Sequence, residues 1–216
     1  EPYSYQWQVS TDNSNFTDIG LEDSINYQPG VLVQTQYYRL QFTSSLGCGT
    51  LYSDTVVVNV YDDLTIPVIS SNTQTTICYD SVPHELFILT DPTGGNGIFT
   101  HQWQMLSGNL WTNIEEDSND TIYQPKNLTD TISYRLISTS TYGCGEVVSE
   151  PYTINVYPII QAGTISGTTP ICYNTNTSLS FLSIPQGGGD TYTYQWQQSD
   201  DEITWNNISM ANGVTY

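Results

Sequence analysis

The sequence contains very few basic residues. Lys and Arg together number 3, against 22 Asp and Glu, and the formal net charge of the 216 residues is -19. A protein that binds nucleic acid needs Lys and Arg to displace the counterions of the phosphates, so this composition argues against nucleic acid as a partner. It argues equally against an anionic membrane surface. The acidic balance suits a chain that stays soluble outside a cell.

Long apolar runs, helical periodicity and catalytic signatures are also missing. No run of about 18 apolar residues is present, so we predict no insertion into a membrane. No zinc-ligand spacing, no Gly-x-Ser-x-Gly and no recurring Ser/His/Asp set occurs, which indicates a protein that is not an enzyme and needs no cofactor. Tyr numbers 17 and Trp 5, however, and this aromatic content argues against disorder.

The sequence contains an internal repeat. Trp7, Trp103 and Trp196 each stand in a "QWQ" triplet and are spaced by 96 and 93 residues. "YYRL" at 37–40 returns as "SYRL" at 133–136. "YQP", "GCG", "ICY" and "NVY" return at matching distances. Such self-similarity is typical of a tandem array of one structural unit, here of about 95 residues.

These spacings predict three domains. Residues 1–61 are the C-terminal part of a first copy, 62–157 are a complete second copy, and 158–216 are the N-terminal part of a third. We therefore expect the chain to be a window on a longer array. The links at 61–66 and 157–163 carry no Gly/Ser tract, and short links favour a stiff, elongated rod.

Each copy is predicted to be an all-β, Ig-like sandwich. In "YTYQWQ" at 192–197 aromatic residues alternate with Gln and Thr, which is the period of a strand that is buried on one face. About seven such short strands in a repeat of this length are typical of a β-sandwich. The "QWQ" strand matches strand C, with its Trp in the core and its Gln residues in water. The "YRL" strand matches strand F and brings Tyr38 and Tyr134 to the core.

The motifs "GG-G-YTYQWQ", "W--I", "Y-P--L", "YYR" and "CGT" together resemble a known repeat type. It is the tandem Ig-like/PKD-like repeat of the giant type IX-secreted surface adhesins of gliding bacteria. The resemblance implies an extracellular location at a bacterial surface and a function in attachment or gliding motility. It implies neighbouring repeats as partners, with a surface polysaccharide or solid substratum beyond them. The alternative is a carbohydrate-binding or passive spacer module of a secreted multidomain enzyme.

Four cysteines recur at two positions of the repeat. Cys48 and Cys144 lie in the predicted F–G turn, and Cys78 and Cys172 lie just before strand B. An exported protein favours disulfides. Cys78 with Cys144 is the simplest pair, although an Ig topology puts these turns at opposite ends of the sandwich. A staple between neighbouring domains and free thiols remain as alternatives.

Arg39 and Arg135 are two of the three basic residues and occupy one register of the repeat. We expect each to form a structural ion pair or to stack on an aromatic ring of strand C. Binding of a ligand is the other interpretation.

The acidic turns at 10–18, 115–120 and 199–202 offer oxygen atoms that could bind calcium. Asp12, Asp18, Asp200 and Asp201 are weak candidates as ligands. No EF-hand spacing occurs, and Asp and Asn are favoured in hairpin turns without any metal.

The glycine loops at 94–97 and 187–190 lead into strands, which argues against a phosphate site. As B–C loops they could touch a ligand or the next domain. Trp111 and Trp205 lie in the C–C′ hairpin, where the first copy has Phe16. We expect them at the edge of the core, or stacked on a sugar ring if they are exposed.

Overall fold

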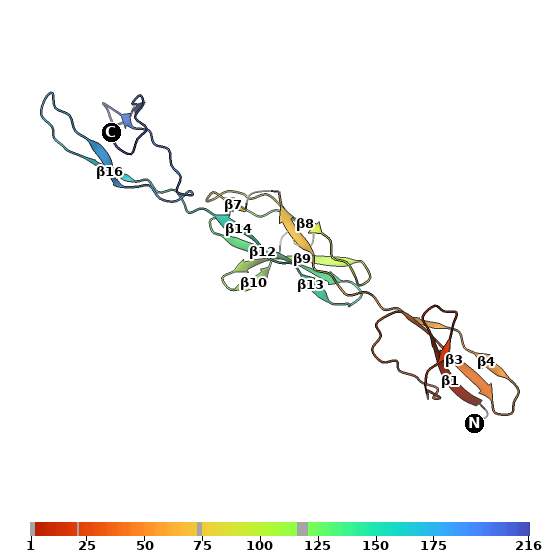
Figure 1. The fold of residues 1–216 in the computed structure, drawn as a ribbon. Coiled ribbons are helices and arrows are strands. Elements are labelled where there is room, and N and C mark those ends of the chain that lie inside the picture. The colour runs from red at the N-terminus through yellow and green to blue at the C-terminus, as the bar shows by residue number, and fades with distance from the viewer. Residues whose placement is uncertain (1–2, 21, 73–74, 116–120) are drawn as a thin grey trace. The chain divides into compact units, whose positions relative to one another are not determined.

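The computed structural model describes residues 3–20, 22–72, 75–115 and 121–216 (Figure 1). These residues form strands and no helix, so the predicted all-β class is confirmed. Contacts divide the chain into two compact units. The first unit is Glu1–Pro67 with the loops Asp91–Thr100 and Ser138–Val147. The second is Val68–Thr90, His101–Ile137 and Val148–Tyr216.

The first copy is a single antiparallel sheet in the order β2-β1-β3-β4, with β5 also pairing β3. In the pairing of β1 with β3, Trp7 lies opposite Leu40 and Gln8 opposite Arg39. The first "QWQ" strand is therefore paired along its length with the first "YRL" strand. The strands are β1 Tyr3–Ser10, β2 Thr17–Asp18, β3 Gln36–Ser44, β4 Thr50–Tyr52 and β5 Val56–Val58.

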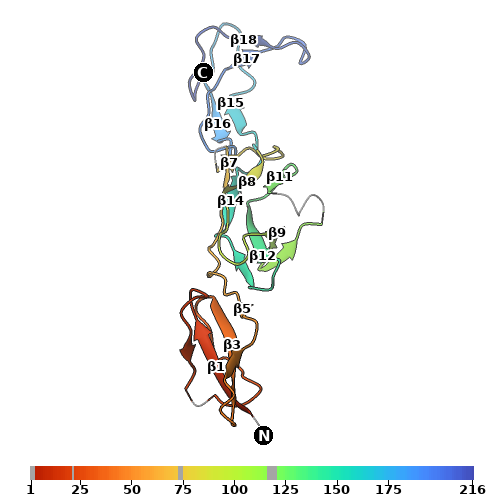
Figure 2. The ribbon, with the colours of Figure 1, turned by 90° about the vertical axis from the view of Figure 1, so that its right-hand side faces the viewer.

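The second copy contains two sheets (Figures 1 and 2). The larger has the order β10-β9-β12-β14-β7, with β13 also pairing β12, and the smaller has the order β11-β8-β6. β14 pairs with β7 in parallel, with Asn155 opposite Thr76 and Val156 opposite Ile77. The strands are β6 Val68–Ser71, β7 Thr76–Ile77, β8 Leu86–Thr90, β9 Phe99–Ser107, β10 Leu110–Asn113, β11 Ile122–Tyr123, β12 Ile132–Ser140, β13 Glu146–Val148 and β14 Tyr152–Val156.

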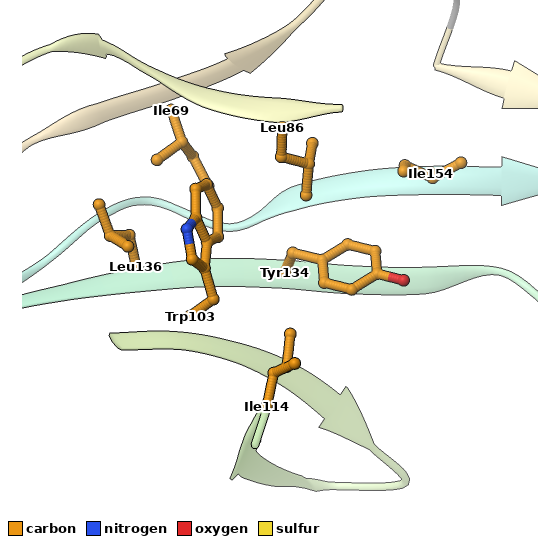
Figure 3. Packing of buried hydrophobic residues seen from close by; sticks show 7 residues of the cluster. All are labelled: Ile69, Leu86, Trp103, Ile114, Tyr134, Leu136 and Ile154. Carbon is orange, nitrogen blue, oxygen red and sulfur yellow. The ribbon is translucent and has the colours of Figure 1, made fainter. Parts of the chain in front are cut away.

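A hydrophobic core joins the two sheets of the second copy (Figure 3). Trp103, Leu86 and Leu136 are fully buried in it, and Tyr134 is 2 % exposed. Every second side chain of a strand points to the same face of its sheet, so these side chains can be buried together. Each large apolar side chain that is fully buried stabilises the fold by about 1.5–3 kcal/mol. The second copy is therefore a β-sandwich, with the predicted strands C, F and G present as β9, β12 and β14. The repeat length and the rod-like arrangement stay predictions.

The third copy forms less regular structure than its sequence predicts. The alternation at 192–197 predicts a strand there, but the structure has only the two-residue strand β17, Gln197–Gln198. In the first copy eight residues of the matching strand pair with β3. Among the described residues of the third copy no such partner is present, so the backbone ladder that defines a strand is missing. The other strands are β15 Thr164–Gly167, β16 Leu179–Ser183 and β18 Asn206–Asn207.

Candidate functional site

The first Gln of each "QWQ" triplet holds two backbone carbonyls together. Gln102 Nε2 donates to the carbonyl oxygens of Trp103 at 2.9 Å and Ile114 at 3.1 Å. The matching Gln6 and Gln195 make the same two bonds in their own copies. This side chain therefore ties strand C to the segment that follows the C–C′ hairpin.

The second Gln of the triplet connects three strands. Gln104 Nε2 donates to Asn113 Oδ1 on β10 at 2.7 Å, and its Oε1 accepts from Arg135 Nε on β12 at 2.7 Å. Gln8 does the same between Asp18 and Arg39. Gln8 and Gln104 are 8 % and 9 % exposed, so the prediction that they face water is wrong. A buried amide needs such partners, because an unsatisfied polar group would be costly.

Both arginines stack on aromatic rings. The guanidinium carbon of Arg39 lies 4.0 Å from the ring centroid of Phe16 and 4.1 Å from that of Tyr52. Arg135 lies 4.4 Å from the ring centroid of Trp111. The rings come from the C–C′ hairpin and from β4, not from strand C as the sequence had suggested. Planar guanidinium groups favour this cation–π geometry.

A second cluster of rings recurs at the core. In the second copy Tyr123 lies 6.0 Å from Trp103 and 5.6 Å from Tyr134, measured between ring centroids. In the first copy Tyr27 bridges Trp7 and Tyr38 at 5.8 and 5.9 Å. Burial raises the pKa of the phenols of Tyr134 and Tyr38 above the usual value. The bridging Tyr belongs to the recurring "YQP" motif, to which sequence reasoning gave no role.

The third copy has the Trp and the bridging Tyr of this cluster. Trp196 is 8 % exposed, and its ring centroid lies 6.1 Å from that of Tyr216. Its indole nitrogen donates to the carbonyl of Gly213 at 3.0 Å, as Trp7 donates to Ser24. The contact between the Trp and Tyr rings thus recurs in all three copies.

The acidic turns use their carboxylates internally. Asp201 accepts from the backbone N–H groups of Thr204 and Ile203 and from the hydroxyl of Ser199, and these bonds lower its pKa to about 2. Asp12 accepts from Asn15, Ser10 and Ser14 and has a pKa lowered in the same way. Calcium needs six to eight oxygen ligands with free lone pairs. The carboxylate oxygens of Asp12 and Asp201 instead accept hydrogen bonds from residues of their own turns.

Other candidate ligands for calcium are equally placed in hairpins. Asp18 accepts from Gln8 Nε2 at 2.7 Å. Asp200 is exposed at the tip of its turn. Residues 116–120 of the second acidic turn lie outside the described residues. Within the described part of the chain, no group of three or more His, Cys, Asp or Glu side chains is placed to hold a metal ion.

All four cysteines are exposed free thiols. The expected pairing of Cys78 with Cys144 is not formed, and strand register gives the reason. Cys78 follows Ile77, which pairs with Val156 beside the start of β12, while Cys144 follows the end of that nine-residue strand. Each residue of a strand adds about 3.3 Å, and a disulfide needs Cα atoms within about 7 Å.

The glycine loops pack against the links that precede their own domains. Gly95 N–H donates to the carbonyl of Asp62 at 2.9 Å, and a Cβ on Gly94 would lie 2.0 Å from the carbonyl oxygen of Asp63. In the third copy Gly188 N–H donates to Pro158, and a Cβ on Gly187 would lie 2.2 Å from the carbonyl oxygen of Ile159. Both glycines of each pair have positive φ. Sequence reasoning had expected a ligand or a neighbouring domain there.

The two Trp residues of the C–C′ hairpin differ in exposure. Trp111 is half-buried beneath Arg135, whereas Trp205 is 55 % exposed. Trp205 borders a hollow of about 420 Å³ in the third copy. No helix in the described part of the chain has the length and apolarity to cross a bilayer.

One protein family matches the chain over three segments, residues 2–62, 68–158 and 161–216, and its description is "Domain of unknown function (DUF8696)". Among solved structures, a crystal structure of the FN1-FN3 domains of chicken CNTN1 is similar at 12 % identity with a TM-score of 0.31. The similarity covers 100 % of this chain and 78 % of that chain. A search of curated proteins found no match.

Proposed function

We propose a structural function for this chain, which belongs to the family described as Domain of unknown function (DUF8696) through three consecutive segments. It serves as a repeat region of a long bacterial cell-surface adhesin or filament that acts in attachment or gliding motility. The observation that carries the proposal is the use of the recurring residues. Both Gln of the "QWQ" triplet, the Arg of the "YRL" strand and the Trp–Tyr cluster all make contacts inside their own copy.

Repetition of internal contacts supports a load-bearing array over an enzyme. A catalytic or binding site needs polar groups that converge on a substrate, whereas here the repeated polar groups satisfy one another. We therefore propose that the chain has no catalytic role and needs no cofactor. Its partners are neighbouring repeats, with a surface polysaccharide or solid substratum as the adhesive target of the whole protein.

The proposed location is extracellular, at the bacterial surface, after export by the type IX route. It rests on the resemblance of the "YTYQWQ", "YYR" and "CGT" motifs to repeats of surface adhesins. The net charge of -19 supports it through strong hydration and self-repulsion.

The test is the intact mass of the protein that carries this sequence in its cell, together with labelling by an antibody against residues 62–157. We expect a very long chain composed mostly of this repeat, reached by the antibody on unbroken cells. A chain of moderate length that ends in a catalytic domain, or a signal only in lysed cells, would overturn the proposal and leave the repeats as spacers.

Carbohydrate binding is a second candidate, favoured by the exposed ring of Trp205. Trp111 does not offer the same face, because Arg135 covers it. A glycan array probed with the chain and with Trp205→Ala separates the two functions. Binding to a defined glycan that is lost in the variant would favour a carbohydrate-binding module.

A further inference from the structure

Two recurring cysteines have no role in the function proposed above. The "GCG" and "ICY" motifs each occur twice at one register of the repeat, and the second copy contains both, as Cys144 and Cys78. Strand register separates these two residues within that copy, so neither is the partner of the other. The contacts of each motif with the links between copies point to a different pairing.

Cys78 lies beside the link that follows its own copy. Strand β7 ends at Ile77, and the carbonyl oxygen of Ile77 accepts a hydrogen bond from the N–H of Tyr157 at 2.9 Å. Tyr157 directly precedes the link to the third copy, and Cys78 is the residue after Ile77. Neighbouring strands lie about 4.8 Å apart, so the backbone of Cys78 is close to the start of that link.

Both links are used in the same way by the copy that follows them. Gly95 N–H donates to the carbonyl of Asp62 at 2.9 Å, and Gly188 N–H donates to the carbonyl of Pro158 at 2.8 Å. Each of these carbonyls follows the Tyr of an "NVY" motif, which is Tyr61 in the first link. The two links are therefore equivalent, and a contact seen at one is expected at the other.

Cys144 lies beside the link that precedes its own copy. It belongs to the turn between β12 and β13, and the ring of Tyr142 in the same turn contacts the ring of Tyr61 at 6.2 Å between centroids. Asn96 Nδ2 donates to Thr141 Oγ1 at 2.9 Å and holds this turn against the glycine loop. Cys144 follows Tyr142 by two residues.

We propose that each junction of the array carries a disulfide between the "ICY" cysteine of one copy and the "GCG" cysteine of the next. Cys78 then pairs with the third copy and Cys144 with the first, through cysteines outside residues 1–216. A disulfide needs Cα atoms within about 7 Å, and each cysteine lies within two residues of a contact with the Tyr of the link. The pairing rests on the proposed function, which supplies a longer array and an oxidising location.

Formation of this bond removes two electrons and two protons from a pair of thiols. The oxidant is the disulfide of a thiol–disulfide oxidoreductase. One cysteine thiolate attacks that disulfide and forms a mixed disulfide with the enzyme. The second thiolate attacks the cysteine sulfur of the mixed disulfide, so the new S–S bond forms and the enzyme leaves with two thiols. The product ties consecutive copies together covalently.

The test is a disulfide map of the protein that carries this sequence, isolated from its cell with free thiols alkylated and digested without reduction. Chymotrypsin is the suitable protease. Trypsin would leave Cys48 and Cys78 on one peptide, because no Lys or Arg lies between Arg39 and Lys126. We expect Cys78 and Cys144 in two separate linked pairs, each with a cysteine of the other motif in a neighbouring copy.

Three results would overturn the proposal while leaving the array in place. They are a peptide that links Cys78 to Cys144, alkylated thiols at both positions, and a protein mass that falls on reduction, which would show links between separate chains. A parent chain without complete copies on both sides of residues 1–216 would overturn it together with the proposed function.

Tyr142→Ala tests whether the link positions the thiols. Loss of the ring contact with Tyr61 should lower the equilibrium constant for forming the Cys144 disulfide in a glutathione buffer by about two- to tenfold. The Cys78 disulfide is the internal control and should not change, because its own junction keeps the ring contact. An unchanged Cys144 disulfide, or an equal change in both, would contradict the proposed geometry. Tyr142 is 71 % exposed, so its replacement is not expected to unfold the second copy.

Discussion

At the scale of single residues, the arginines show how a rare residue type is used. The whole chain has three basic residues, and two of them lie at the same register of strand F. Each donates through Nε to a Gln of strand C and stacks on a ring of the C–C′ hairpin. One side chain thereby joins three neighbouring strands of a sheet.

Replacing Arg135 by Lys should destabilise the second copy by about 1–2 kcal/mol, because Lys has neither the planar group nor the Nε donor. Native-state hydrogen exchange of the Leu136 amide, which donates to Ser149 Oγ at 2.9 Å, measures this change. Glu146→Gln on exposed β13 is a control that should leave the exchange rate within error. A Lys variant as protected as the parent would show that the stack contributes nothing.

The turn carboxylates predict a local pH dependence. The pKa of Asp201 is lowered to about 2 by N–H and O–H donors of its own turn. A lowered pKa means that the ionised form stabilises the turn, so this contribution is present above about pH 4 and is lost as the pH falls towards 2. We expect the Thr204 amide resonance to move over that range.

The control for this titration is Asp201→Asn, in which the movement of the Thr204 resonance should vanish. A similar movement in the variant would assign the titration to another group.

At the scale of elements, the glycine loop and the link before each domain act together. A Cβ on Gly94 would meet the backbone of Asp62 and Asp63, and a Cβ on Gly95 would meet the side chains of Ser140 and Leu64. Tyr61 adds a ring contact with Tyr142 at 6.2 Å between centroids. Thr65 and Thr93 exchange further hydrogen bonds across the same contact.

Gly94→Ala should break this contact, since its Cβ would lie 2.0 Å from the carbonyl oxygen of Asp63. We expect faster hydrogen exchange of the Gly95 and Thr65 amides, which donate to Asp62 and Thr93. Gly143→Ala is the matched control, because φ there is 73° but no atom lies within 4 Å of its Cβ. If both variants change exchange equally, backbone strain and not the close approach is responsible.

Substitutions in the core strands should change the free energy of unfolding by a larger amount. Leu136→Ala on β12 removes a fully buried side chain and should cost about 2–5 kcal/mol of the free energy of unfolding. The exposed Leu110→Ala on β10 should stay within about 0.5 kcal/mol of the parent. Urea unfolding followed by Trp fluorescence measures both. Comparable losses would mean that the core does not lie between the two sheets.

Strand positions were predictable from the sequence where alternation and aromatic content agree, as in β9 and β12. The burial of the Gln residues of strand C was not predictable, because alternation indicates which face of the sheet a residue occupies but not which neighbouring side chains cover that face. Gln104 is buried by Asn113 and Arg135, which lie 9 and 31 residues away in the sequence.

At the scale of the whole molecule, the negative net charge determines the long-range electrostatic interactions. With a formal net charge of -19 and 3 basic residues, most long-range electrostatic interactions within the chain are repulsive. Repulsion between exposed charges is screened at the Debye length, which is about 30 Å at 0.01 M and 8 Å at 0.15 M salt.

We therefore expect the melting temperature to rise by roughly 2–4 °C between 0.01 and 0.15 M KCl, a shift that corresponds to about 1 kcal/mol. Differential scanning calorimetry in EDTA measures it, and the chelator removes any contribution from calcium. A melting temperature that falls with salt would mean that attractive pairs outweigh the repulsion.

The sequence by itself determined the all-β class, the repeat and its register, because these follow from local alternation and from recurrence along one chain. It also placed one aromatic residue in each C–C′ hairpin. The tertiary structure decided what the recurring polar residues do. Amide, guanidinium and ring come from strands distant in the sequence, and only their pairing in the sheet brings them together. The same pairing separates Cys78 from Cys144, which spacing alone had suggested as partners.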